Sequence, residues 1–307
     1  MTSFREIKSR IGGVKNIQQI TRAMKMVAAA RLRRSEDSIR ALRPYSSRLD
    51  HLCARFLHGA TGTEHEFFEE RPVRNIAVLS IASDRGLCGA YNNHVVEATD
   101  RLLRESPGED YHVTAVGARG IAGLRRAGYD IDQAYEDIFN PVHYVVAQDI
   151  TAYLRSLFLN GTVDEVQVVF TEFFSPMRQL VVSRRLLPCP PELHHREVRE
   201  HHARELPEGM HAEPEEVEMA EELIYLYEPD YEQICSRLLE HNLSMQVYRA
   251  LLESQASEHG ARMMAMDNAT DNAEEMVEEL TLQMNRLRQE SITRELLDVV
   301  GGAGAIT

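Results

Sequence analysis

Near the amino end of the chain, apolar and small side chains recur at steps of three and four residues. The positions are Ile7, Ile11, Val14, Ile17, Thr21, Met24 and Ala28. This spacing places them on one stripe of an α-helix, so a helix with one buried face is predicted here. Gly12 and Gly13 weaken it locally, and Pro44 is expected to kink or interrupt it because proline removes a backbone hydrogen bond.

A longer seam occupies the carboxyl end. Steps of three and four residues join Met263, Met266, Thr270, Ala273, Val277, Leu280, Met284, Leu287 and Ser291, which is a heptad pattern. Between Pro229 and Gly301 there is no proline and only one glycine, so one helix is predicted from about Tyr231 to Val299. With a rise of 1.5 Å per residue it would be ~100 Å long, and much of it must protrude from any small domain.

A protruding helix needs a partner, because helical stability comes mostly from burying an apolar face. The amino-terminal stripe supplies that partner, and the two seams are predicted to form an antiparallel coiled coil. Small and polar seam residues such as Thr21, Thr270 and Ala273 predict a thin, imperfect seam rather than a tight zipper.

The middle of the chain alternates strand-like apolar runs with helical segments. Strands are predicted at Asn75–Ala82, Tyr111–Gly117, Asp164–Phe173 and Gln179–Leu187, and helices at Asn93–Glu105, Gly120–Ala127 and Gln148–Leu159. This order favours a sheet with right-handed crossovers. The predicted fold class is α/β, with a Rossmann-like globular domain on a long antiparallel two-helix coiled coil formed by the N- and C-terminal helices.

The predicted division of the chain follows from these patterns. It has a coiled-coil helix at 1–58, the α/β globular domain at 73–190, an acidic, His-rich surface excursion at 191–222, and a loop followed by the long C-terminal helix at 223–307. The excursion is polar and follows Pro188, Pro190 and Pro191, which is typical of a loop.

Charge is distributed unevenly along the chain. Residues 1–58 hold 13 Lys and Arg against 4 Asp and Glu, a balance of +9, whereas residues 192–232 hold 3 against 14, a balance of −11. The net charge of −14 argues against a general nucleic-acid-binding surface. The two ends are therefore expected to have different neighbours.

Cysteine usage and hydropathy narrow the class of protein. Cys53, Cys88, Cys189 and Cys235 lie far apart and form no CxxC pair, so neither a zinc site nor a disulfide framework is indicated. No apolar run approaches the ~20 residues that span a bilayer, and the amino terminus has no signal-peptide core. Any membrane association is expected to go through another protein.

Two glycine-containing loops follow predicted strands, at Ser83–Asn92 and Val116–Gly120. Such loops can hold phosphate at a helix start, but neither GxGxxG nor GxxxxGK[ST] is present. Tight turns with φ > 0 at glycine are the better interpretation. Cys88 is interpreted as a small buried thiol rather than a nucleophile, since nothing in the sequence places a histidine and an acid beside it.

Two further features leave alternatives open. His194, His195, His201 and His202 form two pairs seven residues apart, and without fixed further ligands they do not indicate a functional metal site. The basic residues of the first helix suit nucleic acid, an anionic membrane surface or an acidic protein collar equally well; they are Arg22, Lys25, Arg31, Arg33 and Arg34. An α/β phosphate-ligand enzyme and a basic coiled-coil nucleic-acid binder are the alternative functions.

Both ends of the chain resemble one family. The stretch IKSRIGGVKNIQQITRAMKMVAAARLRRS (Ile7–Ser35) is similar to the opening helix of the gamma subunits of F-type ATP synthases, and SEHGARMMAMDNATDNAEEMVEELTLQMNRLRQESITREL (Ser257–Leu296) to their closing helix. SDRGLCGAYN and the segment Tyr225–Asp230 resemble further parts of that family. The resemblance covers nearly the whole chain except about Pro190–Glu222.

The resemblance implies a function. The chain would be the central rotary shaft of a proton-translocating F-type ATP synthase, with no cofactor, no metal and no catalytic site of its own. Its partners would be the alpha and beta subunits around the shaft, the epsilon subunit and the ring of c subunits, with no nucleic acid. It would lie at the cytoplasmic face of a bacterial inner membrane, held there only through partner subunits. The sequence does not choose between proton and sodium coupling.

The resemblance also implies site residues. Contacts with the alpha and beta subunits, or efficient coupling, would depend on Met24, Arg33, Arg34, Arg262, Arg288, Gln289 and Thr293, and contacts of the rotor foot on Tyr225, Tyr227 and Glu228. Arginine suits such contacts because it makes charge-assisted, bidentate hydrogen bonds. The acidic His-rich excursion departs from the family pattern, and a paired-cysteine insertion of the chloroplast type is absent from the sequence.

Overall fold

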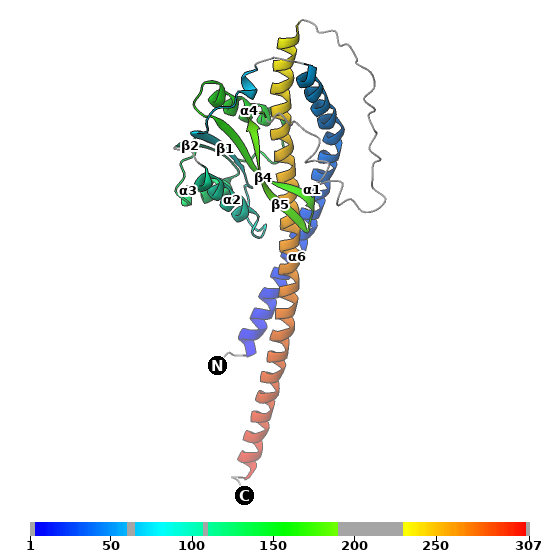
Figure 1. The fold of residues 1–307 in the computed structure, drawn as a ribbon. Helices are drawn as coiled ribbons and strands as arrows, with labels where there is room; N and C mark the ends of the chain where they lie inside the picture. The colour runs from blue at the N-terminus through cyan, green and yellow to red at the C-terminus, as the bar shows by residue number, and fades with distance from the viewer. Residues whose placement is uncertain (1–3, 60–64, 107–109, 190–229, 305–307) are drawn as a thin grey trace.

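A computed structural model of the chain describes residues 4–59, 65–106, 110–189 and 230–304. Two long helices pack against one another, and a small α/β domain lies on one side of the pair (Figure 1). In chain order the elements are α1 Phe4–Gly59, the 3-10 turn η1 Glu66–Phe68, β1 Asn75–Ile81, α2 Tyr91–Glu105, β2 Asp110–Val116, α3 Ala118–Arg126, β3 Gln133–Tyr135, α4 Tyr144–Leu159, β4 Glu165–Ser175, β5 Arg178–Leu187 and α6 Tyr231–Gly304.

The five strands form one sheet in the order β3-β2-β1-β4-β5. β1 pairs in parallel with β2 (Val78 opposite Val113) and with β4 (Val78 opposite Gln167), and β2 pairs in parallel with β3. β5 closes one edge antiparallel to β4, as a hairpin requires. The predicted Rossmann-like α/β sheet is confirmed, and this order places the carboxyl ends of β1 and β2 side by side.

Alternating side chains of β1 build a core on each face of the sheet. Ile76 and Val78 pack with α2 and α3, whereas Ala77, Leu79 and Ile81 pack with α4 and α6. Burial of both faces explains why this strand is a continuous apolar run rather than an alternating one. Because α6 belongs to the core of the sheet as well as to the coiled coil, the globular domain is attached directly to the long helix.

α1 and α6 run antiparallel along one another, and α6 continues past the amino end of α1 (Figure 1). α6 has 74 residues, which corresponds to ~110 Å. Buried seam residues include Thr21 and Ala28 of α1 and Met266 and Ala273 of α6. The predicted coiled coil is therefore confirmed.

Three details differ from the sequence-based expectations. Ile17 is 55% exposed, and the half-buried Gln18 takes the seam position between Val14 and Thr21. Both choices satisfy steps of three and four, so hydrophobicity alone selected the wrong one. Of the kink or interruption expected at Pro44, the interruption is wrong, because α1 continues through Pro44. The three-residue strand β3 was not predicted, because it is too short to show a period.

Candidate functional site

The seam between the two helices is held by polar pairs as well as apolar contacts. Thr21 Oγ1 lies 2.8 Å from Thr270 Oγ1, and Ser35 Oγ donates to Gln255 Oε1 at 3.3 Å. Lys25 forms an ion pair with Asp267 across the same seam. These pairs fix an antiparallel register, because hydroxyl and charged groups match only when they face one another.

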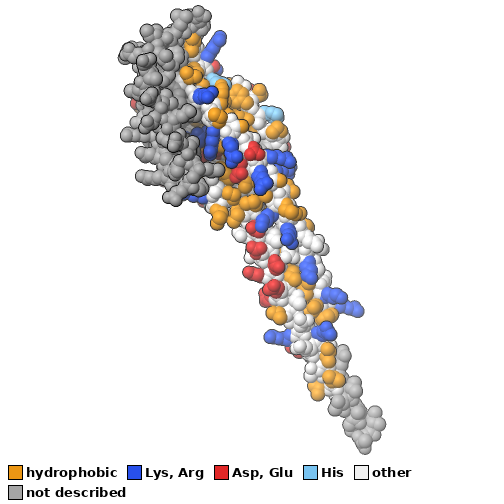
Figure 2. All heavy atoms as spheres, turned by 90° about the vertical axis from the view of Figure 1, so that its right-hand side faces the viewer, with side chains coloured by type: hydrophobic (Ala, Val, Ile, Leu, Met, Phe, Trp, Pro, Cys, Tyr) orange, Lys and Arg blue, Asp and Glu red, His pale blue; other side chains and the backbone are white. Residues whose placement is uncertain are grey.

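Along the shaft, basic side chains stand on α1 and acidic ones on the neighbouring part of α6. Figure 2 shows Lys and Arg side chains lining the shaft beside a group of Asp and Glu. Arg33 and Arg34 are exposed on α1, and Met24 is half-buried at the seam. The acidic residues exposed on α6 are Asp271, Glu274, Glu275, Glu278 and Glu279. The shaft therefore presents an electrically asymmetric surface to whatever surrounds it.

The carboxyl-terminal part of α6 extends beyond the amino end of α1 (Figure 1). Arg288, Gln289 and Thr293 are all exposed in this segment. So are large apolar side chains, with Ile292 46%, Leu296 61% and Leu297 66% exposed. A single helix with exposed leucines is not stable by itself in water, so this tip is suited to a surrounding protein surface.

Arg262 lies differently from the other predicted arginines. It is 8% exposed on the part of α6 that passes the sheet, where Nη2 donates to Gly86 O at 3.1 Å and forms an ion pair with Glu258. His259 Nδ1 lies 3.5 Å from Arg262 Nη1. Burial and the positive charges of Arg262 and Arg31 lower the pKa of His259 to about 4, so this histidine is neutral at pH 7.

Glu258 and His259 were not singled out from the sequence. Burial raises the pKa of the Glu258 carboxyl, an effect that the neighbouring Arg262 opposes. The sequence signal was available as the i, i+4 spacing of Glu258 and Arg262 on a helix. Nothing in the sequence, however, indicated that Arg262 also donates to the backbone carbonyl of Gly86.

The first glycine-containing loop, Ser83–Asn92, is held in place by hydrogen bonds of its own side chains. Ser83 N and Ser83 Oγ both donate to Asn92 Oδ1, at 3.0 and 2.9 Å. Asp84 Oδ1 accepts hydrogen bonds from Ala118 N at the start of α3 and from Asp137 N. A carboxylate of the chain itself thus occupies the helix start at which a phosphate would bind.

Glycine provides the positive φ predicted for these turns at Gly89 and Gly117, with φ of 60° and 89°. Leu87 also has a positive φ, 63°, and is 64% exposed. A left-handed leucine is uncommon, and this one lies in a loop whose residues Ser83 and Cys88 are hydrogen-bonded to Asn92.

Cys88 is a buried thiol, as predicted. Asn92 Nδ2 donates to its sulfur at 3.2 Å, and its thiol donates to Arg85 O at 3.7 Å. Burial raises its pKa, the opposite of what a nucleophilic cysteine requires.

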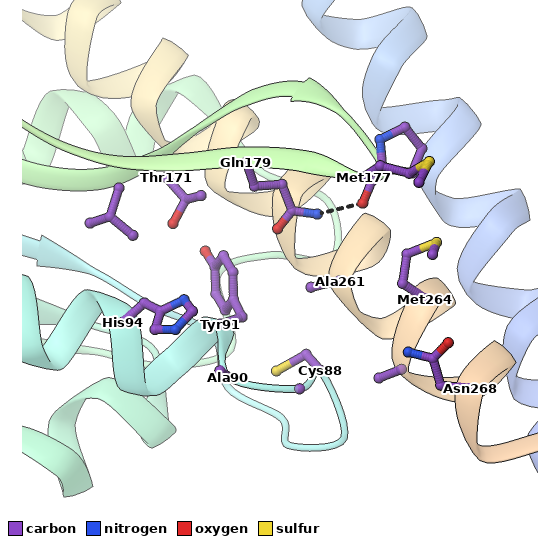
Figure 3. A pocket seen from close by; sticks show the side chains of 14 residues that line it. Cys88, Ala90, Tyr91, His94, Thr171, Met177, Gln179, Ala261, Met264 and Asn268 are labelled. Atoms are coloured by element: carbon purple, nitrogen blue, oxygen red, sulfur yellow. Dashed lines mark hydrogen bonds between the residues drawn. The ribbon is translucent and has the colours of Figure 1, made fainter. Parts of the chain in front are cut away.

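A pocket of about 410 Å³ lies beside this loop, between the β4–β5 hairpin and α6 (Figure 3). Tyr91 and Cys88 line it from the loop side, Met177 and Gln179 from the hairpin, and Met264 from α6. Among the described residues, its lining includes His94 but no Lys, Arg, Asp or Glu side chain. An apolar pocket of this kind does not fit a phosphate-bearing substrate, which would require cationic or clustered N–H donors.

Some predicted residues lie outside the part of the chain that the structure describes. These are the foot residues Tyr225, Tyr227 and Glu228, the excursion 191–222 and its histidine pairs. Among the described residues no group of His, Cys, Asp or Glu is arranged to hold a metal ion. No described helix combines the length and the hydropathy needed to cross a membrane.

Known proteins are similar in sequence to this chain over its full length. The family model described as "ATP synthase" matches residues 3–306. The chain is 38% identical to the ATP synthase gamma chain of Heliobacterium modesticaldum over 306 residues, covering 100% of both chains. It is 35% identical to the ATP synthase gamma chain of Cytophaga hutchinsonii, covering 100% of this chain and 99% of that one.

Solved structures share the fold. A chain of the Euglena gracilis mitochondrial ATP synthase, from a structure of its OSCP, F1 and c-ring, aligns with a TM-score of 0.67 at 19% identity, over 99% of this chain and 94% of that chain. A chain of the Tetrahymena thermophila enzyme, from a structure of the central stalk and c-ring, aligns with a TM-score of 0.58 at 24% identity, over 81% and 99%. Sequence over the full length and fold agree, and the chain belongs to the ATP synthase gamma chain family.

Proposed function

We propose that this chain is the central rotary shaft of a proton-translocating F-type ATP synthase. The observation that carries the proposal is the helix α6, which is anchored in the globular domain at one end and leaves its partner α1 behind at the other. A shaft must be longer than the part that anchors it, and its free tip must be covered by another protein. The apolar residues exposed at that tip meet this second requirement.

The proposed partners follow from the family and from the surface. The alpha and beta subunits would surround the shaft, meeting Met24, Arg33 and Arg34 on α1 and Arg288, Gln289 and Thr293 on α6. The epsilon subunit and the ring of c subunits would meet the foot loop with Tyr225, Tyr227 and Glu228. Among the structures with a similar fold, one is described as a central stalk with its c-ring and another as a rotor.

In this function the chain transmits torque and carries out no chemistry. Rotation of a shaft whose surface charge differs from side to side presents each beta subunit with a different surface in turn. Each subunit is thereby biased toward a different conformation, because binding shifts a conformational equilibrium only when the contacts differ between states. The chain would work at the cytoplasmic face of a bacterial inner membrane, attached through its partner subunits.

Assembly tests the proposal. The chain is mixed with the alpha and beta subunits of its own complex, and the mass of the product is measured by size-exclusion chromatography with light scattering. One copy of the chain per alpha-beta hexamer is expected. A chain that folds but elutes alone would contradict the proposal. In vesicles holding the complete complex, ATP-driven gradients of protons and of sodium are then compared to identify the ion.

A further inference from the structure

A buried ion pair joins the long helix to the globular domain at one point. Glu258 and Arg262 stand one turn apart on α6, with 6% and 8% of their surface exposed. They face the loop that connects β1 to α2, where Arg262 Nη2 donates to Gly86 O. A charged side chain is rarely this buried unless its hydrogen bonds are satisfied by specific partners.

Arg262 already has three partners inside the chain. Its guanidinium contacts Gly86 O, the Glu258 carboxylate and the ring of His259. To reach an acidic group on a neighbouring subunit, Arg262 would have to leave the buried Glu258 carboxylate with the neutral ring of His259, 3.3 Å away, in place of a cationic partner. That rearrangement is costly, because breaking one half of a buried pair strands the other half.

The loop that receives Arg262 is rigid on its other side. Asp84 ties it to the start of α3, and Ser83 ties it to Asn92 of α2. Two more contacts fasten it to α6: Tyr91 Oη donates to Ser254 O at 3.1 Å, and Gly89 packs close to Ala265. The loop is thus a short brace between the carboxyl edge of the sheet and the long helix.

We propose that Glu258 and Arg262 form an internal latch that locks the loop Ser83–Tyr91 to α6. The latch adds to the core packing that already attaches the sheet to this helix, and it keeps the loop moving with the shaft as one body. Arg262 then serves coupling from inside the chain, in place of the contact with another subunit expected from the sequence. Glu258 is the positioning residue that aims the guanidinium at Gly86 O. The consequence for coupling rests on the proposed shaft function, whereas the latch itself does not.

The latch is tested first in the isolated chain, through access to Cys88. Cys53, Cys189 and Cys235 are replaced by alanine, and the rate at which a thiol reagent labels the buried Cys88 measures loop opening. Arg262→Gln is expected to raise this rate by about tenfold or more, because a hydrogen bond from a charged donor is lost. Glu258→Gln is expected to raise it as well, by a smaller factor.

The matched control is Arg288→Gln, which removes an exposed arginine from the same helix far from the loop. It is expected to leave the labelling rate of Cys88 unchanged. A labelling rate that Arg262→Gln does not raise, or that Arg288→Gln raises equally, would overturn the latch.

A covalent replacement then tests where Arg262 acts. A Cβ built on Gly89 lies 4.0 Å from Ala265 Cβ, within the 3.5–4.5 Å range of a disulfide. The positive φ of Gly89, 60°, strains a cysteine there equally with and without the disulfide, so the two redox states of one variant are compared. In the complete complex, with Cys88→Ala and Arg262→Gln in place, Gly89→Cys and Ala265→Cys would staple the loop to α6. Under reducing conditions this variant is expected to pump fewer ions per ATP than the parent. Once gel analysis shows that the disulfide has formed, the number of ions pumped per ATP is expected to return to near the parent value.

Pumping that stays low with the disulfide formed would show that Arg262 acts outside the chain, which overturns the proposal. Failure of the parent complex to assemble or pump would instead count against the shaft function. The labelling experiment would still decide whether the latch exists.

Discussion

Thr21 and Thr270 face one another across the coiled coil, with their hydroxyl oxygens 2.8 Å apart. This pair sets the register of the whole shaft. Phe4 lies 17 residues before Thr21, so the residue opposite it lies 17 after Thr270, at Leu287. Leu287 is indeed half-buried, and Arg288 is exposed. The exposed contact residues predicted on α6, Arg288, Gln289 and Thr293, therefore begin where the coiled coil ends.

Replacement of Arg288 and Gln289 by alanine is expected to weaken assembly with alpha and beta subunits by about tenfold or more, since arginine anchors at such interfaces carry much of the affinity. Both side chains are exposed, so the stability of the isolated chain should not change. Native mass spectrometry over a concentration series measures assembly. Gln283→Ala, which changes another exposed residue earlier in α6, is the control. Unchanged assembly of the double variant would refute this contact.

Met24 tests the basic face of α1. It is half-buried beside Lys25, which already pairs with Asp267. Met24→Lys adds a cation that is expected to bind an acidic collar too tightly and to lower the ions pumped per ATP by up to about fivefold, the range of one exposed ion pair. Met24→Gln, similar in length and uncharged, is the control. Equal pumping by the lysine variant and the parent, measured by a pH-sensitive dye in vesicles, would make this prediction wrong.

The sequence predicted the shaft well because a long helical period is repeated many times. Nine seam positions in α6 share one period, so a single exception such as the exposed Ser291 does not obscure the pattern. In α1 the choice between Ile17 and Gln18 rested on one residue, and packing against α6 decided against the isoleucine. Strands β1, β2, β4 and β5 were found because each holds a cluster of apolar, mostly β-branched or aromatic residues, although Ser183, Arg184 and Arg185 interrupt it in β5.

The latch could not be predicted in the same way. Arg262 and Gly86 are 176 residues apart, and the acceptor is a backbone carbonyl, which every residue carries. Only the fold brings the β1–α2 loop against α6. Resemblance indicated that Arg262 matters, but not which atoms it touches.

Gly117 and Gly128 separate backbone strain from steric clash. Both have a positive φ, 89° and 96°. A Cβ on Gly117 would lie 2.6 Å from Ala82 O, whereas one on Gly128 would meet nothing within 4 Å. Gly128→Ala is expected to lower the free energy of unfolding by about 1–2 kcal/mol, and Gly117→Ala by more than about 3 kcal/mol. Urea unfolding followed by circular dichroism gives both values, and equal losses would contradict the close approach of Gly117 to the end of β1.

His259 gives the chain a pH dependence of known sign. Its pKa falls from 6.5 in the unfolded chain to about 4 in the fold, so the unfolded state binds more protons between these values. The stability that the neutral His259 contributes is fully present above pH 6.5 and is lost as pH falls toward 4 and below. The complete loss is about 3 kcal/mol. The raised pKa of Glu258 acts in the opposite direction, so the histidine must be isolated by difference.

His259→Gln removes that titration. The unfolding free energy of the parent minus that of the variant should therefore fall as pH falls from 6.5 to 4. Urea unfolding at each pH measures both values. A difference that is constant across this range would show that His259 titrates normally in the fold.

The most direct test of the shaft is to watch it turn. The chain is assembled with its alpha and beta subunits fixed to a surface, and a bead is attached to the globular domain at Asp110, which is exposed at the start of β2. With ATP present, the account predicts stepwise rotation in one direction. A bead that only fluctuates, on complexes that hydrolyse ATP at the same time, would contradict it.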